Sequence, residues 1–326
     1  MTLFAKATPA AVRKAAAFIR GGGTAVFPTE TVYGLGADAL NAKAVAGIFE
    51  IKKRPRFDPL IVHVASIRQA KTLARVTPAA ETLMKRFWPG PLTLVLPKKK
   101  IVPDIVTAGL DTVALRMPNN AVALALIKAA GTPIAAPSAN SFGSLSPTTA
   151  VHARDQLKGG PDMILDAGKA RIGVESTVLA FRNGRGSILR HGGLPQEEIE
   201  RVTGCLDADL KGGPRPASPG QLLKHYSPNA ALRMTGKTPV KREKGLRYGY
   251  LAFTTRPSAA VKIFRILSRS GNLEEAAANL FSHLHALDRA GVDVILAEPV
   301  PAKGLGRAIM DRLKRAAAAK HPRNIP

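Results

Sequence analysis

The 326-residue sequence predicts an α/β protein with a large N-terminal domain and a smaller C-terminal α/β domain. Strand-like and helix-like segments alternate through the first two hundred residues, which is typical of a sheet covered by helices. The chain is longer than the roughly 100–200 residues of a usual single domain. A segment rich in proline and glycine, residues 211–220, separates the two parts. We therefore expect domains at 1–205 and 231–326, joined by a linker over 206–230.

The helices of the first domain are predicted from their capping residues and apolar spacing. Thr8 is a good N-cap, Pro9 suits the first helical turn, and the glycines at 21–23 end a helix over 10–20. Thr77 is expected to cap another helix in the same way. The other expected helices are 42–52, 78–87, 121–130 and 148–157. Strands are expected at 24–27, 60–65, 92–96, 113–117, 133–136, 163–165, 176–181 and 187–190.

The second domain repeats the pattern on a smaller scale. Strands are expected at 247–253, 261–267 and 292–296, and helices at 272–290 and 305–319. Asn272 and Glu275 form a variant of the capping box at the start of the first of these helices. The cations between Arg307 and Arg315 are expected on a solvated helix face. The second domain is therefore a small α/β unit.

Composition narrows the class of protein. The net charge of +25 favours anionic partners such as nucleotides or nucleic acid. The single Cys205 excludes an intrachain disulfide and a zinc site of the CxxC type, and the seven histidines show no HExxH pattern, so we expect no structural transition metal. No apolar run reaches about 18 residues and no signal-peptide core is present. We expect a cytoplasmic protein without membrane contact.

A run of polar residues follows the apolar strand at 24–27. It contains Thr29, Glu30 and Thr31 and ends in Gly34 and Gly36, residue types that suit a strand end opening into a ligand site. The cluster Lys52-Lys53-Arg54-Pro55-Arg56 follows about twenty residues later. Its cations answer a helix macrodipole or bind phosphate, for which guanidinium groups are well shaped. Together the two segments predict a polyphosphate site.

Four further segments place polar groups at strand ends. The loop from Ala136 to Thr148 joins a strand to a helix and carries several hydroxyls and an amide, which suit phosphate or carboxylate oxygens. Arg116 ends an apolar strand and either faces solvent or points into a ligand crevice. Glu175-Ser176-Thr177 and Arg190-His191-Gly192-Gly193 repeat this arrangement. The segment from Gly34 to Ala39 also fits the dinucleotide fingerprint G-x-G-x-x-A, although polar residues interrupt the strand before it.

These segments together resemble the YrdC-type family of L-threonylcarbamoyladenylate synthases. The resemblance rests on PTETVYGLG, KKRP with DPLIVH, PGPLTLVL, VALRMP, PSANSFGSLSPT, GVESTV and ILRHGG. The later segments SPGQLLKHYSP, ILAEPVP and GLGRAIMDRL are similar to those of the two-domain branch. The resemblance implies a twisted open mixed sheet with helices and a basic concave face in the first domain.

The resemblance also implies an activity. Such an enzyme is a nucleotidyltransferase that joins L-threonine, bicarbonate and ATP into threonylcarbamoyl-AMP and releases pyrophosphate, with Mg²⁺ accompanying the triphosphate. The product supplies a tRNA modification next to the anticodon, so downstream tRNA threonylcarbamoyl-transfer proteins are expected partners. The alternative is an RNA- or tRNA-binding module that uses the basic surface, and a weak RNA contact is compatible with either. A third reading, an NAD(P) oxidoreductase, rests on Gly34 and Gly36.

The family roles carry over to matching positions. The expected catalytic cations are Lys52 and Arg54. The residues expected to contact L-threonine are Thr31, His63, Arg116, Ala136 and Ser176. Those expected on the ATP side are Lys52, Arg54, Asp58, Thr112, Ser138, Asn140, Ser146, Arg190 and Tyr226. Asp58 stands where the family often has asparagine, and a carboxylate side chain beside phosphate is unfavourable. Tyr226 lies in the linker, which we expect to fold over the site as a lid.

Overall fold

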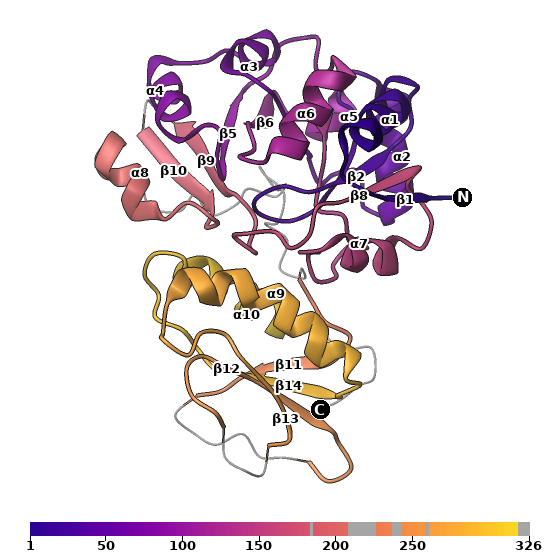
Figure 1. The fold of residues 1–326 in the computed structure, drawn as a ribbon. Helices are drawn as coiled ribbons and strands as arrows, with labels where there is room; N and C mark the ends of the chain where they lie inside the picture. Colours follow the sequence, from indigo (N-terminus) through magenta and orange to yellow (C-terminus); the bar gives the residue numbers. More distant parts are fainter. Residues whose placement is uncertain (183–184, 208–225, 237–242, 258–260, 319–326) are drawn as a thin grey trace.

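The computed structural model describes residues 1–182, 185–207, 226–236, 243–257 and 261–318. In these residues the chain forms two sheets with helices, as the sequence predicted (Figure 1). The larger sheet is mixed and runs in the order β1-β8-β2-β3-β7-β4-β6-β5-β9-β10. Its strands are β1 (Leu3–Lys6), β2 (Ala25–Phe27), β3 (Gly34–Asp38), β4 (Ile61–His63), β5 (Leu92–Pro97), β6 (Thr112–Arg116), β7 (Ile134–Ala135), β8 (Met163–Asp166), β9 (Thr177–Arg182) and β10 (Arg185–Arg190).

Helices cover the large sheet, and apolar side chains fill the space between. One core cluster joins α1 and α6 to β2 and β8, and another gathers residues of α2, α3, α4, α5, α7 and α8 against the sheet. The bounds are α1 (Pro9–Arg20), α2 (Ala42–Lys52), α3 (Ile67–Leu73), α4 (Pro78–Phe87), α5 (Asp104–Thr107), α6 (Ala121–Ala130), α7 (Ala150–Leu157) and α8 (Gln196–Thr203). Thr8 and Thr77 cap α1 and α4 as expected, each accepting a hydrogen bond from a backbone N–H.

Strand β3 contradicts the dinucleotide-fingerprint reading of the segment from Gly34 to Ala39. After the turn at 28–33 the chain returns antiparallel to β2, with Val26 paired to Leu35. A Cβ on Gly36 would lie 2.5 Å from Ile134 Cγ2 and 2.7 Å from Phe27 Cε1, so glycine is required there for packing. The dinucleotide fingerprint therefore falls within a strand and forms no phosphate-binding turn. The sequence pattern does not indicate this strand, because its glycines carry no apolar side chain.

The smaller sheet is parallel and has the order β11-β14-β12-β13. Its elements are β11 (Ala231–Met234), β12 (Tyr248–Ala252), β13 (Ile263–Ile266), α9 (Leu273–Arg289), β14 (Val294–Ala297) and α10 (Gly306–Ala317). Asn272 caps α9, whereas Glu275 accepts from the Ser268 hydroxyl, which itself accepts the Asn272 N–H at 2.9 Å. The expected capping box is therefore closed through a serine. The predicted linker segment 211–220 lies outside the described residues.

Helices α9 and α10 lie on the side of the small sheet that faces the large domain (Figure 1). The apolar cluster of the C-terminal domain includes Val32, Leu145 and Val174 of the large domain, so one core crosses the boundary. A Cβ on Gly173 would lie 2.5 Å from the Ala277 carbonyl oxygen in α9, which shows how closely the two backbones approach. The two domains are therefore tightly packed against each other.

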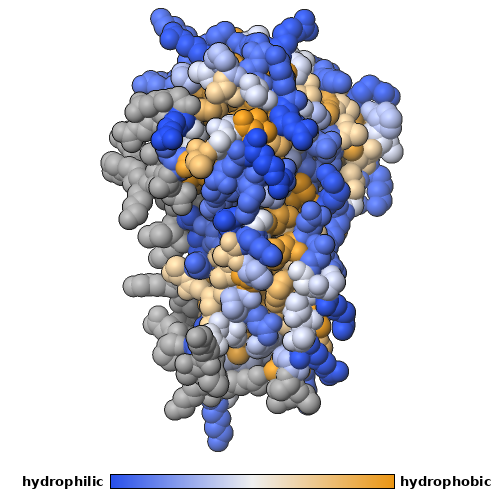
Figure 2. All heavy atoms as spheres, turned by 90° about the vertical axis from the view of Figure 1, so that its left-hand side faces the viewer, coloured by the Kyte–Doolittle hydropathy of each residue, from blue (hydrophilic) through white to orange (hydrophobic). Residues whose placement is uncertain are grey.

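The surface agrees with the charged composition. On the face shown in Figure 2, hydrophilic residues predominate and hydrophobic atoms appear only in small groups. Among the described residues, none of the helices has the length and apolar character needed to cross a bilayer.

Candidate functional site

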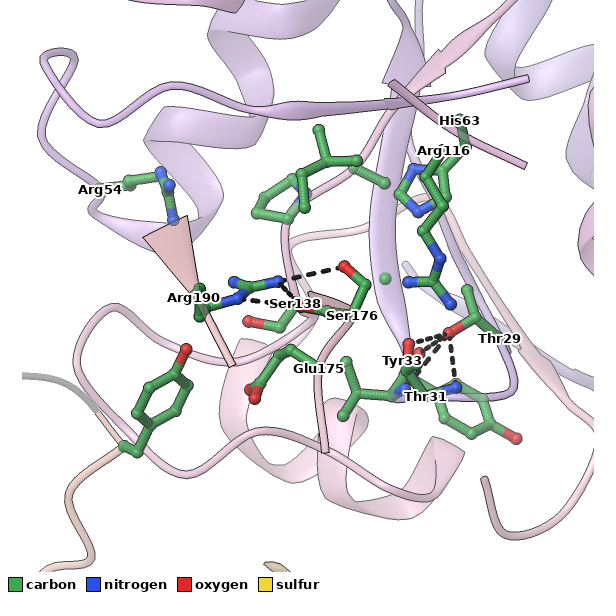
Figure 3. A pocket seen from close by; sticks show the side chains of 16 residues that line it. Thr29, Thr31, Tyr33, Arg54, His63, Arg116, Ser138, Glu175, Ser176 and Arg190 are labelled. Atoms are coloured by element: carbon green, nitrogen blue, oxygen red, sulfur yellow. Dashed lines mark hydrogen bonds between the residues drawn. The ribbon is translucent and has the colours of Figure 1, made fainter. Parts of the chain in front are cut away.

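A cavity lies where several strand ends of the large sheet meet Tyr226 (Figure 3). The turn between β2 and β3 forms one part of its wall, and the ends of β4, β6 and β10 carry side chains into it. Residues expected to bind substrate line the cavity as follows: Thr31, Arg54, His63, Arg116, Ala136, Ser138, Ser176, Arg190 and Tyr226. The strand-end arrangement expected from the sequence is thus present in one place.

Arg116 and His63 stand on one side of the cavity (Figure 3). Arg116 Nη2 lies 2.7 Å from Glu30 Oε2, and both side chains are almost fully buried. The arginine therefore does not face solvent, and its charge is balanced by a carboxylate of the β2–β3 turn. Thr31 completes this side; its hydroxyl lies 2.8 Å from that of Thr29.

His63 is held neutral. Its ring meets Phe27 edge-on at a centroid distance of 5.9 Å. Burial, together with the nearby Arg116 charge, lowers the pKa of His63 to about 3. A neutral imidazole beside a cation suits a site that receives a small zwitterion, because it adds no second positive charge.

Arg54 and Arg190 stand on the other side (Figure 3). Arg54 Nη2 lies 2.8 Å from Asp58 Oδ2, and the pair is buried. Burial raises the pKa of Asp58, while Arg54 and Lys52 oppose that shift. Arg190 Nη2 donates to the Ser176 carbonyl at 2.9 Å and to the Ser176 hydroxyl at 3.2 Å. The guanidinium groups converge on one region, which favours an anionic ligand.

Lys52 lies behind this wall, outside the set of lining residues. Its Nζ donates to the Ser138 carbonyl at 2.6 Å and to the Asn140 carbonyl. Burial and the neighbouring Arg54 lower the pKa of Lys52 well below its usual value. The lysine thus fixes the loop that presents Ser138 to the cavity. Asn140 also supports this loop, donating to the Ser144 carbonyl at 2.9 Å.

Three other expected residues take different positions. Asp58 is close to the cavity through its pairing with Arg54. Ser146 is buried and donates to the carboxylate of Glu175, a lining residue. Thr112 begins β6, at the end of the strand opposite Arg116, and is not among the lining residues. A five-residue strand spans more than about 12 Å, so Thr112 is distant from Arg116.

Sequence reasoning missed the roles of Glu175 and Arg312. Arg312 was expected on a solvated helix face, but its side chain is fully buried and its Nε lies 2.7 Å from Glu175 Oε2. The signal was present in the helical spacing. Arg312 shares one face of α10 with buried apolar residues, namely Ala308, Ile309, Leu313 and Ala316. A cation at that spacing has to find a buried partner.

Comparisons with known proteins identify the family. The model described as telomere recombination, covering Sua5, YciO and YrdC, matches residues 17–192, and the model of the threonylcarbamoyl-AMP synthase C-terminal domain matches residues 194–318. A threonylcarbamoyl-AMP synthase of Pyrococcus abyssi is 46% identical over 322 residues, with 94% of this chain and 93% of that protein covered. One from Bacillus subtilis is 45% identical over 326 residues, with 95% and 93% covered.

A solved structure agrees with these matches. The crystal structure of Pyrococcus abyssi Sua5 complexed with L-threonine is similar, with a TM-score of 0.88, 44% identity and 97% of each chain covered. The similarity covers 97% of this chain, and so it spans the residues matched by both family models and the strands of both sheets. The synthase reading is therefore favoured over the RNA-binding module. The chain belongs to the two-domain Sua5/YrdC family of threonylcarbamoyl-AMP synthases.

Proposed function

We propose that this chain makes threonylcarbamoyl-AMP from L-threonine, bicarbonate and ATP. The observation that carries the proposal is the cavity with Arg116 and His63 on one side and Arg54 and Arg190 on the other. The threonine complex of the Pyrococcus abyssi relative supports the choice of amino acid.

The first side receives L-threonine in this proposal. Arg116 binds the threonine carboxylate, exchanging the Glu30 carboxylate for that of the substrate. His63, Thr31, Ser176 and the Ala136 backbone surround the remainder of the amino acid. The neutral state of His63 leaves the threonine amine without a further cation beside it.

The second side receives ATP. Arg54 and Arg190 bind phosphate oxygens, and the Ser138 loop, fixed by Lys52 and Asn140, offers hydroxyl and backbone groups. Ser146 acts through Glu175, and Asp58 through Arg54. Thr112 stays on the ATP side in this proposal, with the nucleotide extending beyond the cavity toward the start of β6.

The reaction needs no covalent enzyme intermediate. Bicarbonate takes up a proton and loses water to give CO₂. The threonine amine adds to the CO₂ carbon and releases a proton, which leaves a carbamate. A carbamate oxygen then bonds to the α-phosphorus while the bond from that phosphorus to the bridging oxygen breaks, and pyrophosphate leaves. Arg54 and Arg190 offset charge on the leaving group, and the two-sided cavity holds the carbamate in line with the α-phosphate.

Mg²⁺ enters this proposal with the triphosphate. Among the described residues there is no cluster of three or more histidine, cysteine, aspartate or glutamate side chains suited to a metal ion. The side chains of this described part of the chain therefore do not form a cage for the ion, and we assign no step to it. Phosphate oxygens and water are its expected ligands.

The remaining parts of the proposal concern the surroundings of the site. We divide the chain into a catalytic domain over 1–205, a lid over 206–230 and a C-terminal domain over 231–326. The buried position of Tyr226 at the cavity supports the lid, since closure excludes water from a labile product. The product passes to proteins that transfer the threonylcarbamoyl group to tRNA, and we place the reaction in the cytoplasm, where ATP and tRNA occur.

Pyrophosphate release tests the proposal directly. It is expected only when L-threonine, bicarbonate and ATP are all present, and the nucleotide product should carry both the threonine and the CO₂ carbon. Release that is independent of threonine or of bicarbonate would overturn the assignment.

A further inference from the structure

We infer that Arg312 is a positioning residue through which the C-terminal domain completes the ATP side of the cavity. The inference rests on the proposed ATP side and goes beyond it, because Arg312 belongs to α10 and lines no part of the cavity itself. Its guanidinium reaches across the domain boundary to residues that do line the cavity.

The contacts of Arg312 are directed at the site. Nε lies 2.7 Å from Glu175 Oε2, and Nη2 donates to the His191 carbonyl at 3.0 Å, directly after Arg190. The guanidinium carbon lies 4.7 Å from the centre of the Tyr226 ring. One buried cation therefore holds three segments of the site: the residues before β9, those after β10, and the end of the linker.

The charge of Arg312 matters because Glu175 lines a cavity that binds an anion in our proposal. Burial by itself would raise the pKa of Glu175, but Arg312, Arg190 and the Ser146 hydroxyl outweigh it and hold that pKa below its usual value. The carboxylate is therefore ionised. Without Arg312 it would oppose a triphosphate, and it would compete for Arg190.

The residues around Arg312 also take part in the packing of the C-terminal domain against the large domain. Tyr226 also packs on Phe281 of α9, with ring centres 5.7 Å apart. Val174, next to Glu175, belongs to the apolar cluster of the C-terminal domain. Packing of that domain against the large domain therefore also brings Arg312 to Glu175 and balances its charge. In this inference the affinity for ATP depends on that packing.

Four variants of the full-length chain separate this role from simple docking. They are Arg312→Gln, Glu175→Gln, the double variant, and Arg307→Gln as a matched control. Arg307 is also on α10 and also pairs across the boundary, with Glu197, but it is partly exposed and its partner does not line the cavity. The readouts are the Kd values for ATP and for L-threonine by calorimetry, with thermal unfolding as a check on folding.

Arg312→Gln is expected to weaken ATP binding at least tenfold and to change threonine binding less than twofold. The double variant should recover to within threefold of the unmodified chain, because no uncompensated carboxylate remains, and Arg307→Gln should match the unmodified chain. An Arg312→Gln effect no larger than that of Arg307→Gln, or a double variant as weak as the single one, would overturn the inference.

Two safeguards keep the test decisive. If Arg312→Gln does not fold, Arg312→Lys and Glu175→Gln replace it. Arg312→Lys keeps the positive charge and is expected to keep the ATP Kd within threefold. Glu175→Gln removes the carboxylate that opposes the triphosphate and is expected to tighten ATP binding; a tenfold loss in Glu175→Gln contradicts the role. Pyrophosphate release by the unmodified chain is measured separately. Its absence would refute the proposed function, whereas an unchanged ATP Kd in Arg312→Gln would refute only the inference.

Discussion

The Arg116 guanidinium lies 2.7 Å from the Glu30 carboxylate; Arg116 lines the cavity, and Glu30 lies buried behind it. The Glu30 carboxylate is the partner of Arg116, a role that a substrate carboxylate takes in our proposal. On the opposite side Arg54 pairs with the Asp58 carboxylate, and in our proposal a phosphate oxygen binds the same guanidinium. Both cations are thus kept in the fold without ligand, because a buried charge without a partner is costly.

Arginine substitutions should separate the two sides of the cavity. Arg116→Ala is expected to raise the KM for threonine more than that for ATP, and Arg54→Ala should do the reverse. Each loss should reach about ten- to a hundredfold, the effect of about 1.5–3 kcal/mol for a charge-assisted contact. Steady-state kinetics with each substrate varied in turn measures the split. Equal effects of both variants on both substrates would contradict the partition.

Asp58→Asn should improve ATP binding and weaken the free protein. The amide no longer competes with phosphate for Arg54, so the KM for ATP should fall about threefold. The free energy of unfolding without ATP should decrease by about 1–3 kcal/mol, because the buried guanidinium loses its counter-ion. ATP should therefore raise the Tm of this variant more than that of the unmodified chain. A smaller ATP-induced shift would count against this reading.

The buried His63 should make stability depend on pH. Its pKa is about 3 in the folded chain and about 6.5 when unfolded, so between these values only the unfolded state binds the proton. The contribution of His63 to the free energy of unfolding is fully present above pH 6.5 and is lost as the pH falls. From pH 7 to pH 5 this contribution decreases by about 2 kcal/mol. Urea unfolding of the chain and of His63→Asn measures it. Equal pH dependence in both would show that another group is responsible.

Tyr226 should control the fate of the product. Tyr226→Ala removes a buried ring that packs on Phe281 and on the Arg312 guanidinium, so water should reach the cavity. More AMP should form for each pyrophosphate released, since the carbamoyl adenylate hydrolyses before it leaves. Tyr226→Phe keeps the ring and serves as the control. An unchanged ratio of AMP to pyrophosphate in Tyr226→Ala would speak against the lid.

Two glycine substitutions should have opposite effects on stability. Gly36→Ala places a methyl group 2.5 Å from Ile134 Cγ2 and should lower the free energy of unfolding by about 1–3 kcal/mol. Gly47→Ala, inside α2 with no atom within 4 Å of the added Cβ, should raise it by about 0.5–1 kcal/mol. Denaturant titrations give both values. A Gly36→Ala chain as stable as the unmodified one would disprove the packing role of Gly36.

The sequence by itself determined the local features of the fold. Thr8, Thr77 and Asn272 were recognisable as helix caps because capping depends on residues within one turn. Apolar runs marked strands such as β5 and β6. Short or glycine-containing elements were missed, among them β1, β3, β11, α3, α5 and α8, because their stability comes from neighbours that are distant in sequence.

The same division applies to the site. Motif content was sufficient to name the family and most of the residues that line the cavity, since residue types at strand ends are visible in the chain itself. Only the tertiary structure decided which charges pair, that Lys52 supports a loop behind the wall, and that Arg312 reaches Glu175 across the domain boundary. These contacts join segments far apart in the chain, 86 residues for Lys52 and Ser138 and 137 for Arg312 and Glu175, and no local pattern encodes such distances.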